Sequence, residues 1–324
     1  MESKDQQNTS GSPESHNPKK FSRFKIKELP AIFKSSFKAW NAQDPFRQSA
    51  VIAYYAVFSL PALLVVIIAV AGFIFGREAV TGQLSAQIGK MMGADTAKQI
   101  EEMIANAAIG NKSVWATILA VITILIGASG VFVQLQKSLN MIWEVKAATG
   151  KKAILKLLQT RLLSFGMILS IGFLLIISLV ITSLISFFGD WMNAQLPDMA
   201  VIIMQVLNFL ISFGIITLLF ALMYKYLPDA KIKWNEVWVG AILTSILFSI
   251  GKQALGFYFG KADPSSAYGA AGSIVLIMLW ISYSCMIFFF GAEFTRQYTT
   301  WGGKKIEPTE EAVKDPVARI KIKQ

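Results

Sequence analysis

Residues Ala267–Phe294 read AYGAAGSIVLIMLWISYSCMIFFFGAEF, and this apolar run decides the class of the protein. A helix rises about 1.5 Å per residue, so about 20 apolar residues cross the hydrocarbon core of a bilayer. Glu293, next to the end, is the one acidic residue of the run. A stretch of this length and polarity is typical of a membrane span.

Five further runs of the same kind precede it. They are Phe46–Gly76, Val114–Trp143, Leu162–Phe188, Val201–Tyr226 and Val237–Gly260. The chain is 54% hydrophobic and 16% charged, whereas a soluble domain is about 25% charged. Its polar surface is therefore too small to coat a water-soluble particle. We predict an all-α, polytopic membrane protein whose domain, 46–298, has six transmembrane helices.

Lysine and arginine are concentrated on alternate connections between the runs. Nine lie at or before Arg47, five in Lys146–Arg161, three in Lys225–Lys233 and seven from Arg296 onward. The other three connections carry four, none and one. Because cytoplasmic loops hold the excess of Lys and Arg, both termini are predicted to be cytoplasmic. This pattern assigns the net charge of +11 to membrane topology rather than to nucleic acid.

The segments outside the spans are polar or amphipathic. Residues 1–20 lack apolar periodicity and are predicted to be a disordered tail. Residues 21–45 place aromatic residues among lysines, which predicts a short amphipathic helix on the inner membrane surface. The external segment 77–113 has two amphipathic stripes, so we expect two short helices that either cap a cavity or pack on the bundle. Residues 299–324 are a charged cytoplasmic tail, expected to be disordered from Lys304 onward.

Polar side chains inside the runs are the candidates for a cavity or transport path, because lipid tolerates them only beside protein or water. Lys252 either snorkels to the outer headgroups or lines a polar cavity. Glu293 is predicted to lie in an ionic cluster near the inner leaflet, with Lys137 as its favoured partner. The candidate set is Gln134, Lys137, Asn140, Gln205, Asn208, Lys252, Tyr268 and Glu293.

Residue types that carry catalysis are sparse in this chain. The single histidine, His16, lies in the polar tail, and the single cysteine, Cys285, lies in the sixth run. Neither a His-based or thiolate metal centre nor an intrachain disulfide can be built from them. The sequence contains no phosphate-binding loop and no nucleophile elbow. We therefore expect no enzyme, no cofactor and no bound metal.

Several motifs together resemble the YihY/virulence factor BrkB family of bacterial inner-membrane proteins. The resemblance covers about Phe37 to Tyr298 and all six runs, and it implies a six-helix multi-pass protein of the bacterial cell inner membrane. The family has carried the label ribonuclease BN, although the residues for RNA hydrolysis are absent here. The motifs are Ala53–Pro61 (AYYAVFSLP), Val131–Trp143 (VFVQLQKSLNMIW), Tyr226–Asp229 (YLPD), Tyr268–Ser273 (YGAAGS) and Gly291–Phe294 (GAEF).

Two functions follow as hypotheses. In the first, the protein is a transporter or flippase of an envelope lipid or small solute, which is what the resemblance to that family implies. In the second, it is a structural scaffold of the envelope, whose polar groups are hydrogen-bond partners between helices. A ribonuclease is the least expected function. The expected partners are membrane lipids, with an anionic lipid or small molecule as cargo and no nucleic acid. A homo-oligomer is left open.

Overall fold

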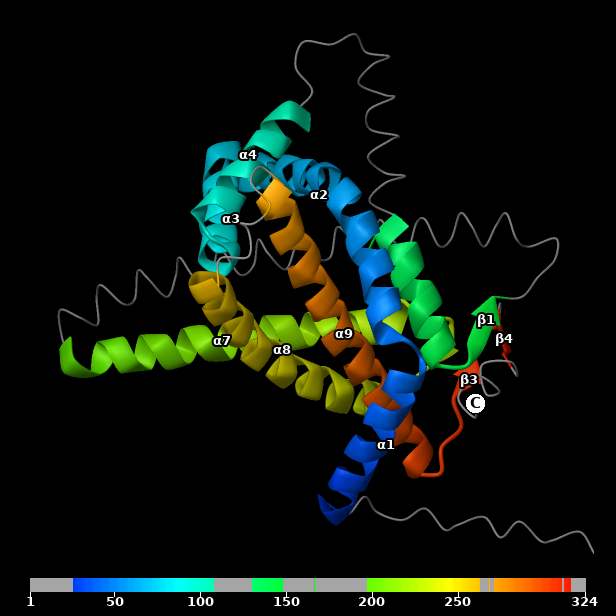
Figure 1. Cartoon of the computed structure of the whole chain (residues 1–324). Coiled ribbons are helices and arrows are strands. Elements are labelled where there is room, and N and C mark those ends of the chain that lie inside the picture. The colour runs from blue at the N-terminus through cyan, green and yellow to red at the C-terminus, as the bar shows by residue number, and fades with distance from the viewer. Residues whose placement is uncertain are drawn as a thin grey trace, which may run out of the picture.

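The computed structural model describes residues 26–107, 130–147, 166, 197–262, 268, 271–310 and 312–315. These residues are mostly helical, as predicted (Figure 1). The helices are a 3-10 turn at Ile26–Glu28, α1 (Leu29–Ala42), α2 (Pro45–Phe75), α3 (Arg77–Met92), α4 (Ala94–Ala107), residues 130–142, α7 (Pro197–Tyr226), α8 (Trp234–Ala262) and α9 (Gly272–Trp301). The short strands are β1 (Val145–Ala147), β2 (Ala230–Lys231), β3 (Glu307–Pro308) and β4 (Ala312–Lys314).

Three of the described helices are long and apolar enough to cross a membrane. These segments are Ile202–Tyr226, Trp234–Phe259 and Gly272–Trp301, and they coincide with the fourth, fifth and sixth predicted runs. Helix α2 matches the bounds of the first run. Of the second run the structure describes residues 130–143, and the third run lies outside the described residues except for Gly166. The count of six spans and the orientation of the termini stay predictions.

Helix α9 occupies the middle of the described helices in Figure 1. It packs against α1, α2, α4 and α8. Its buried side chains include Phe288 and Phe289, which join the largest apolar cluster together with Leu139, Ala221 and Val237. The sixth run is therefore the helix against which four of the other described helices pack.

Helices α8 and α9 approach closely through two small residues each. A methyl group added to Gly240 would lie 1.6 Å from the Thr295 hydroxyl oxygen, and one added to Gly291 would lie 1.8 Å from the Thr244 hydroxyl oxygen. Each threonine stands four residues after the glycine of its own helix, and donates a hydrogen bond to that glycine's carbonyl. Such small-residue pairs let helix backbones approach in a bilayer.

The amphipathic segment predicted at 21–45 forms α1, which lies against α9. Ile32, Ser36 and Ala39 are buried, and the Trp40 indole N–H donates a 3.1 Å hydrogen bond to the Met286 carbonyl. Phe33 and Phe37 are partly exposed, although the Phe33 ring packs edge-on against Phe290 of α9 at 5.1 Å between centroids and the Phe37 ring lies 5.5 Å from that of Trp40. Helix α1 thus packs its apolar side on α9 and leaves part of its aromatic surface uncovered by the described residues.

The described part of the segment predicted to be external, residues 77–107, forms two helices, as predicted. Val80 of α3 and Ile100 and Ile104 of α4 are buried against Leu64 and Ile68 of α2. Of the two predicted arrangements, the described contacts are those of packing on the bundle.

The C-terminal tail is ordered up to residue 315 in the described part, which corrects the prediction of disorder from Lys304 onward. Strand β3 pairs antiparallel with β2, and β4 pairs antiparallel with β1. The Thr309 amide also donates a hydrogen bond to the Asp229 carbonyl. Two pairs of short strands therefore add to the predicted all-α architecture, and the tail binds the two connections that carry β1 and β2.

Candidate functional site

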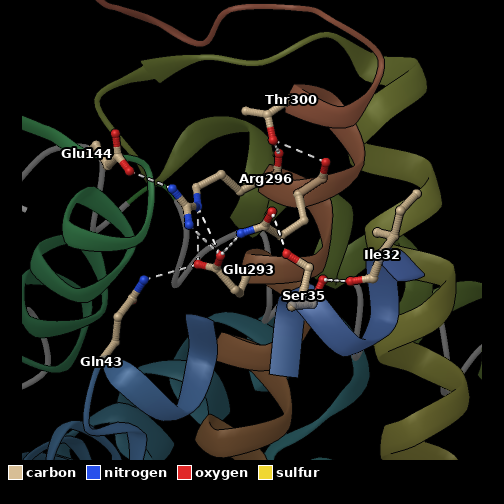
Figure 2. A network of polar contacts seen from close by, with 9 residues as sticks. Ile32, Ser35, Gln43, Glu144, Glu293, Arg296 and Thr300 are labelled. Carbon is tan, nitrogen blue, oxygen red and sulfur yellow. Dashed lines mark hydrogen bonds and ion pairs between the residues drawn. The ribbon is translucent and has the colours of Figure 1, made fainter. Parts of the chain in front are cut away.

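A buried ionic network lies at the end of α9 that is predicted to be cytoplasmic (Figure 2). Glu293 is fully buried. The Arg296 guanidinium donates to its carboxylate from Nε at 3.0 Å and from Nη2 at 2.6 Å, and donates to Glu144 from Nη1 at 2.6 Å. Gln297 and Gln43 add hydrogen bonds of 2.8 and 3.1 Å to the same Glu293 carboxylate.

Three parts of the chain build this network. Glu293, Arg296 and Gln297 share one face of α9 because they are three and four residues apart. Gln43 follows the end of α1, and Glu144 follows helical residues 130–142 in a left-handed backbone conformation with φ of 56°. A left-handed conformation is unfavourable for a residue with a β-carbon. The backbone at Glu144 is therefore held by its surroundings, including the Asp315 amide that donates to its carbonyl.

The cluster predicted around Glu293 is confirmed, but its predicted partner is wrong. Lys137 is exposed, and the cation that pairs with Glu293 is Arg296. Arg296 is favoured because its position one helical turn further along α9 aims it at Glu293. Its planar guanidinium also offers five donors in a fixed fork, and it contacts Glu293 through Nε and Nη2 and Glu144 through Nη1.

A second polar cluster surrounds Asp229, which the sequence analysis did not single out. Asn140 donates a 2.9 Å hydrogen bond to the Asp229 carboxylate and accepts a 2.8 Å bond from its backbone amide. Gln136 donates to the other carboxylate oxygen at 3.3 Å. Both partners come from one face of helical residues 130–142. The cluster therefore ties that helix to the loop after α7.

Replacing Asn140 with alanine should lower the free energy of unfolding by about 1–3 kcal/mol, because a buried carboxylate and a backbone amide lose their partner together. Reversible unfolding in a denaturing detergent titration measures this change. Asn208→Ala is the matched control, because Asn208 is exposed, and it should change stability by less than about 0.5 kcal/mol. Equal effects of the two substitutions would contradict the structural role of Asn140.

A pocket of about 650 Å³ lies beside the ionic network, between the end of α9 and the tail. Glu144 and Arg296 line it from the network, and Trp143 lines it from the preceding turn. The tail contributes lysines on both sides of β3. The residues from this part are Gly303, Lys304, Lys305, Ile306, Lys314 and Asp315. Lys304 is paired with Glu236 of α8 at 2.9 Å.

The predicted candidate residues fall into two groups. Asn140 and Glu293 are committed to the two clusters just described, and Gln134 is half-buried in the same helix as Asn140. The other candidates, which are Lys137, Gln205, Asn208, Lys252 and Tyr268, are exposed. Gln205 and Asn208 lie on one side of α7. They are about as far along the chain from the first residue of α7 as Lys252 is from the last residue of α8, which runs antiparallel to α7. None of these placements tests a role in transport.

The sequence analysis did not predict that Asp229, Glu144, Trp143 and the tail lysines lie together at one end of the molecule. Asp229 had a usable signal, because YLPD ends a span with a carboxylate directly after apolar residues. The tail lysines had none, since strands of two and three residues leave no periodic pattern.

Comparison with known proteins identifies the family. Residues 36–314 match the family described as virulence factor BrkB. The chain belongs to this family. The match extends past α9 to Lys314, the last residue of β4.

Relatives of this BrkB family protein are named UPF0761 membrane proteins. That of Tolumonas auensis is 28% identical over 52% of this chain and 52% of its own length. That of Stenotrophomonas maltophilia is 26% identical over 75% of this chain and 54% of its own length. That of Mannheimia succiniciproducens is 26% identical over 83% of this chain and 89% of its own length. The chain thus spans about half of the length of several relatives. No solved structure matches it. The protein is a membrane protein.

Proposed function

We propose that the protein is a transporter or flippase in the bacterial inner membrane, moving an envelope lipid or a small solute that carries a negative charge. The observation that carries this proposal is the exposed lysine of α8. Lys252 stands ten residues before the end of an apolar helix. A charged side chain within a membrane-crossing segment is costly unless it meets water, protein or a charged partner.

Exposed amides at a similar distance from a helix end support the same reading. Gln205 and Asn208 are exposed on α7, and α7 packs against α8. An ammonium group beside neutral amides is suited to a cargo with one negative charge. The ammonium supplies the opposite charge, and the amides supply hydrogen bonds without the desolvation cost of a further charged group. Asn140 and Glu293 have no part in this path, since their hydrogen bonds are used within the protein.

Replacing Lys252 with methionine should reduce transport at least about tenfold, if its interaction with the moving cargo is worth 1.4 kcal/mol or more. The assay is the movement of fluorescent phosphatidylglycerol and of radiolabelled glycerol 3-phosphate across proteoliposomes. Lys261→Met is the matched control, because Lys261 is an exposed lysine near the end of the same helix, and it should keep the wild-type rate. A wild-type protein that moves neither probe, or a Lys252→Met variant at full rate, contradicts the proposal.

A structural scaffold is the second candidate, favoured by the density of hydrogen bonds between separate parts of the chain. The Glu293 network joins α1, α9 and the turn at Glu144, and the Asp229 cluster joins two further segments. In this case Lys252→Met leaves the behaviour of the protein unchanged. Inert proteoliposomes together with a fully stable Lys252→Met variant would favour the scaffold over the transporter.

A further inference from the structure

The tail after α9 crosses two separate connections of the chain. Two residues past the end of α9, Gly303 has a left-handed φ of 74°, and the Lys304 amide donates to the Thr299 carbonyl across this turn. A glycine in this conformation is a common way to end a helix and redirect the chain. Beyond the turn, β3 pairs with β2, which joins α7 to α8, and β4 pairs with β1, which follows helical residues 130–142. One segment therefore ties the end of α9 to two other parts of the bundle.

This segment, which we call the strap, consists of residues 303–310 and 312–315, and polar contacts hold it in place. The Thr309 and Asp315 amides donate at 3.0 and 2.8 Å to the carbonyls of the residues before β2 and β1. The Lys304 ammonium group pairs with Glu236 of α8 at 2.9 Å. The strand pairs add backbone hydrogen bonds over two and three residues. Each of these contacts joins the strap to a loop, a short strand or the first turn of a helix.

The strap buries little apolar surface. Ala312 is buried and Ile306 is partly buried against the largest apolar cluster, but Val313 is 44% exposed. The pocket of about 650 Å³ lies between part of the strap and the end of α9, so the two are not closely packed there. Few buried apolar contacts and short hydrogen-bonded ladders characterise segments that open locally while the rest of the fold stays intact.

The position of the strap is coupled to the buried ionic network through Glu144. A residue with a β-carbon keeps a left-handed conformation only where its surroundings hold it, and the Asp315 amide of the strap holds the Glu144 carbonyl. The Glu144 carboxylate in turn accepts the 2.6 Å hydrogen bond from Arg296. When β4 leaves β1, the backbone of Glu144 loses this hold, and its carboxylate is no longer fixed beside Arg296.

We propose that the strap opens and closes as one unit about the turn at Gly303, while the helices stay in place, and that its closed state holds Glu144 in the ionic network. In the closed state the strap braces helical residues 130–142 against the hairpin of α7 and α8. In the open state this brace is released, and Arg296 keeps Glu293 as its partner. The proposal concerns this end of the bundle and does not depend on transport.

Hydrogen exchange of the purified full chain in detergent, followed by mass spectrometry, tests the proposal. In the wild type, amides of the two strand pairs should exchange at least about tenfold faster than amides of α8 and α9 around Gly240 and Gly291, because they open locally. Slow exchange of the strand pairs, at the rate of α8 and α9, would mean that the strap opens only with the whole fold and would overturn the proposal.

A disulfide between β1 and β4 then tests whether the strap moves as one unit. Lys146 and Val313 are exposed and directly opposite each other in the two strands, which is a spacing that a disulfide can bridge, and the native Cys285 is buried. In the oxidised variant Lys146→Cys with Val313→Cys, exchange in both strand pairs and at Glu144 should slow at least about tenfold, because β3 lies between the turn and the disulfide. The same variant after reduction should exchange as the wild type does. A disulfide that does not form, or one that leaves β2, β3 or Glu144 unchanged, overturns the proposal.

Substitutions at the turn provide a test without a cross-link. Gly303→Ala should speed exchange in both strand pairs at least about fivefold, since the closed strap needs a left-handed backbone there, which is unfavourable for alanine. The added methyl group itself meets no atom within 4 Å. Gly302→Ala is the matched control, because Gly302 has an ordinary φ of −70° and the nearest atom to its methyl group would be at 3.5 Å. It should stay within twofold of the wild type, and equal effects of the two substitutions would contradict the role of the turn.

Discussion

Replacing Arg296 with methionine is expected to lower the free energy of unfolding by about 3–5 kcal/mol, the usual cost of removing one partner from a buried ion pair. Glu293 would keep its two amide hydrogen bonds but lose its cation while fully buried. Glu144 would lose its 2.6 Å contact as well. Methionine retains most of the apolar stem of arginine and lacks the guanidinium, so the main loss is that of the charge and its hydrogen bonds.

Unfolding in a reversible detergent titration measures this effect, with Arg47→Met as the matched control. Arg47 also pairs with a carboxylate in the same chain segment, Asp44 at 3.2 Å, but both side chains are largely exposed. Exposed pairs contribute about 0–1 kcal/mol. If Arg296→Met were no more destabilising than Arg47→Met, the network would not hold α1 and α9 together.

Replacing Gly240 with alanine is expected to destabilise the protein by about 3 kcal/mol, at the upper end of the usual cost of overpacking. The added methyl group would lie 1.6 Å from the Thr295 hydroxyl and 2.9 Å from its β-carbon. Thr295 is fully buried, so it cannot swing out of the way. The two helices must separate, and the matching contact between Thr244 and Gly291 would open with them.

Gly256→Ala, in the same helix, separates this clash from the general effect of the substitution. A methyl group at position 256 has no atom within 4 Å. Alanine stabilises a helix interior by roughly 0.5–1 kcal/mol relative to glycine, so this variant should be neutral or slightly more stable. The readout for both is the midpoint of thermal unfolding in detergent. A stable Gly240→Ala variant would show that α8 and α9 do not meet at these residues.

The long helices could be predicted from the sequence because their signal is local. The fourth, fifth and sixth runs reappear as α7, α8 and α9 with ends within seven residues, and α2 follows the first run within one residue. The buried acid at Glu293 was also predictable, because a carboxylate in an apolar run demands a cation. Whether that cation is Lys137 or Arg296 could not be predicted, since the answer depends on how helical residues 130–142 are rotated about their axis.

The contacts between distant segments had no local signal. Nothing in the sequence distinguishes Gly240 and Thr295 from other small residues. They contact each other only because α8 and α9 cross at these positions. Tyr224 and Tyr226 both lie at the end of the fourth run, yet Tyr224 is fully buried and its hydroxyl donates to the Phe288 carbonyl, while Tyr226 is exposed. Two positions along the helix separate an exposed tyrosine from a core tyrosine. Sequence alone does not tell which face of α7 meets α9.

The central place of α9 has a consequence for how the chain matures. A ribosome supplies segments from the N-terminus onward, so α1 and α2 are synthesised long before the helix against which both pack. Gln43 and Glu293, which are hydrogen-bonded in the fold, lie 250 residues apart in the chain, and the tail that pairs with β1 and β2 is synthesised after α9. Insertion of the early spans therefore precedes completion of the fold. A nascent chain halted before α9 lacks the helix against which α1 and α2 pack.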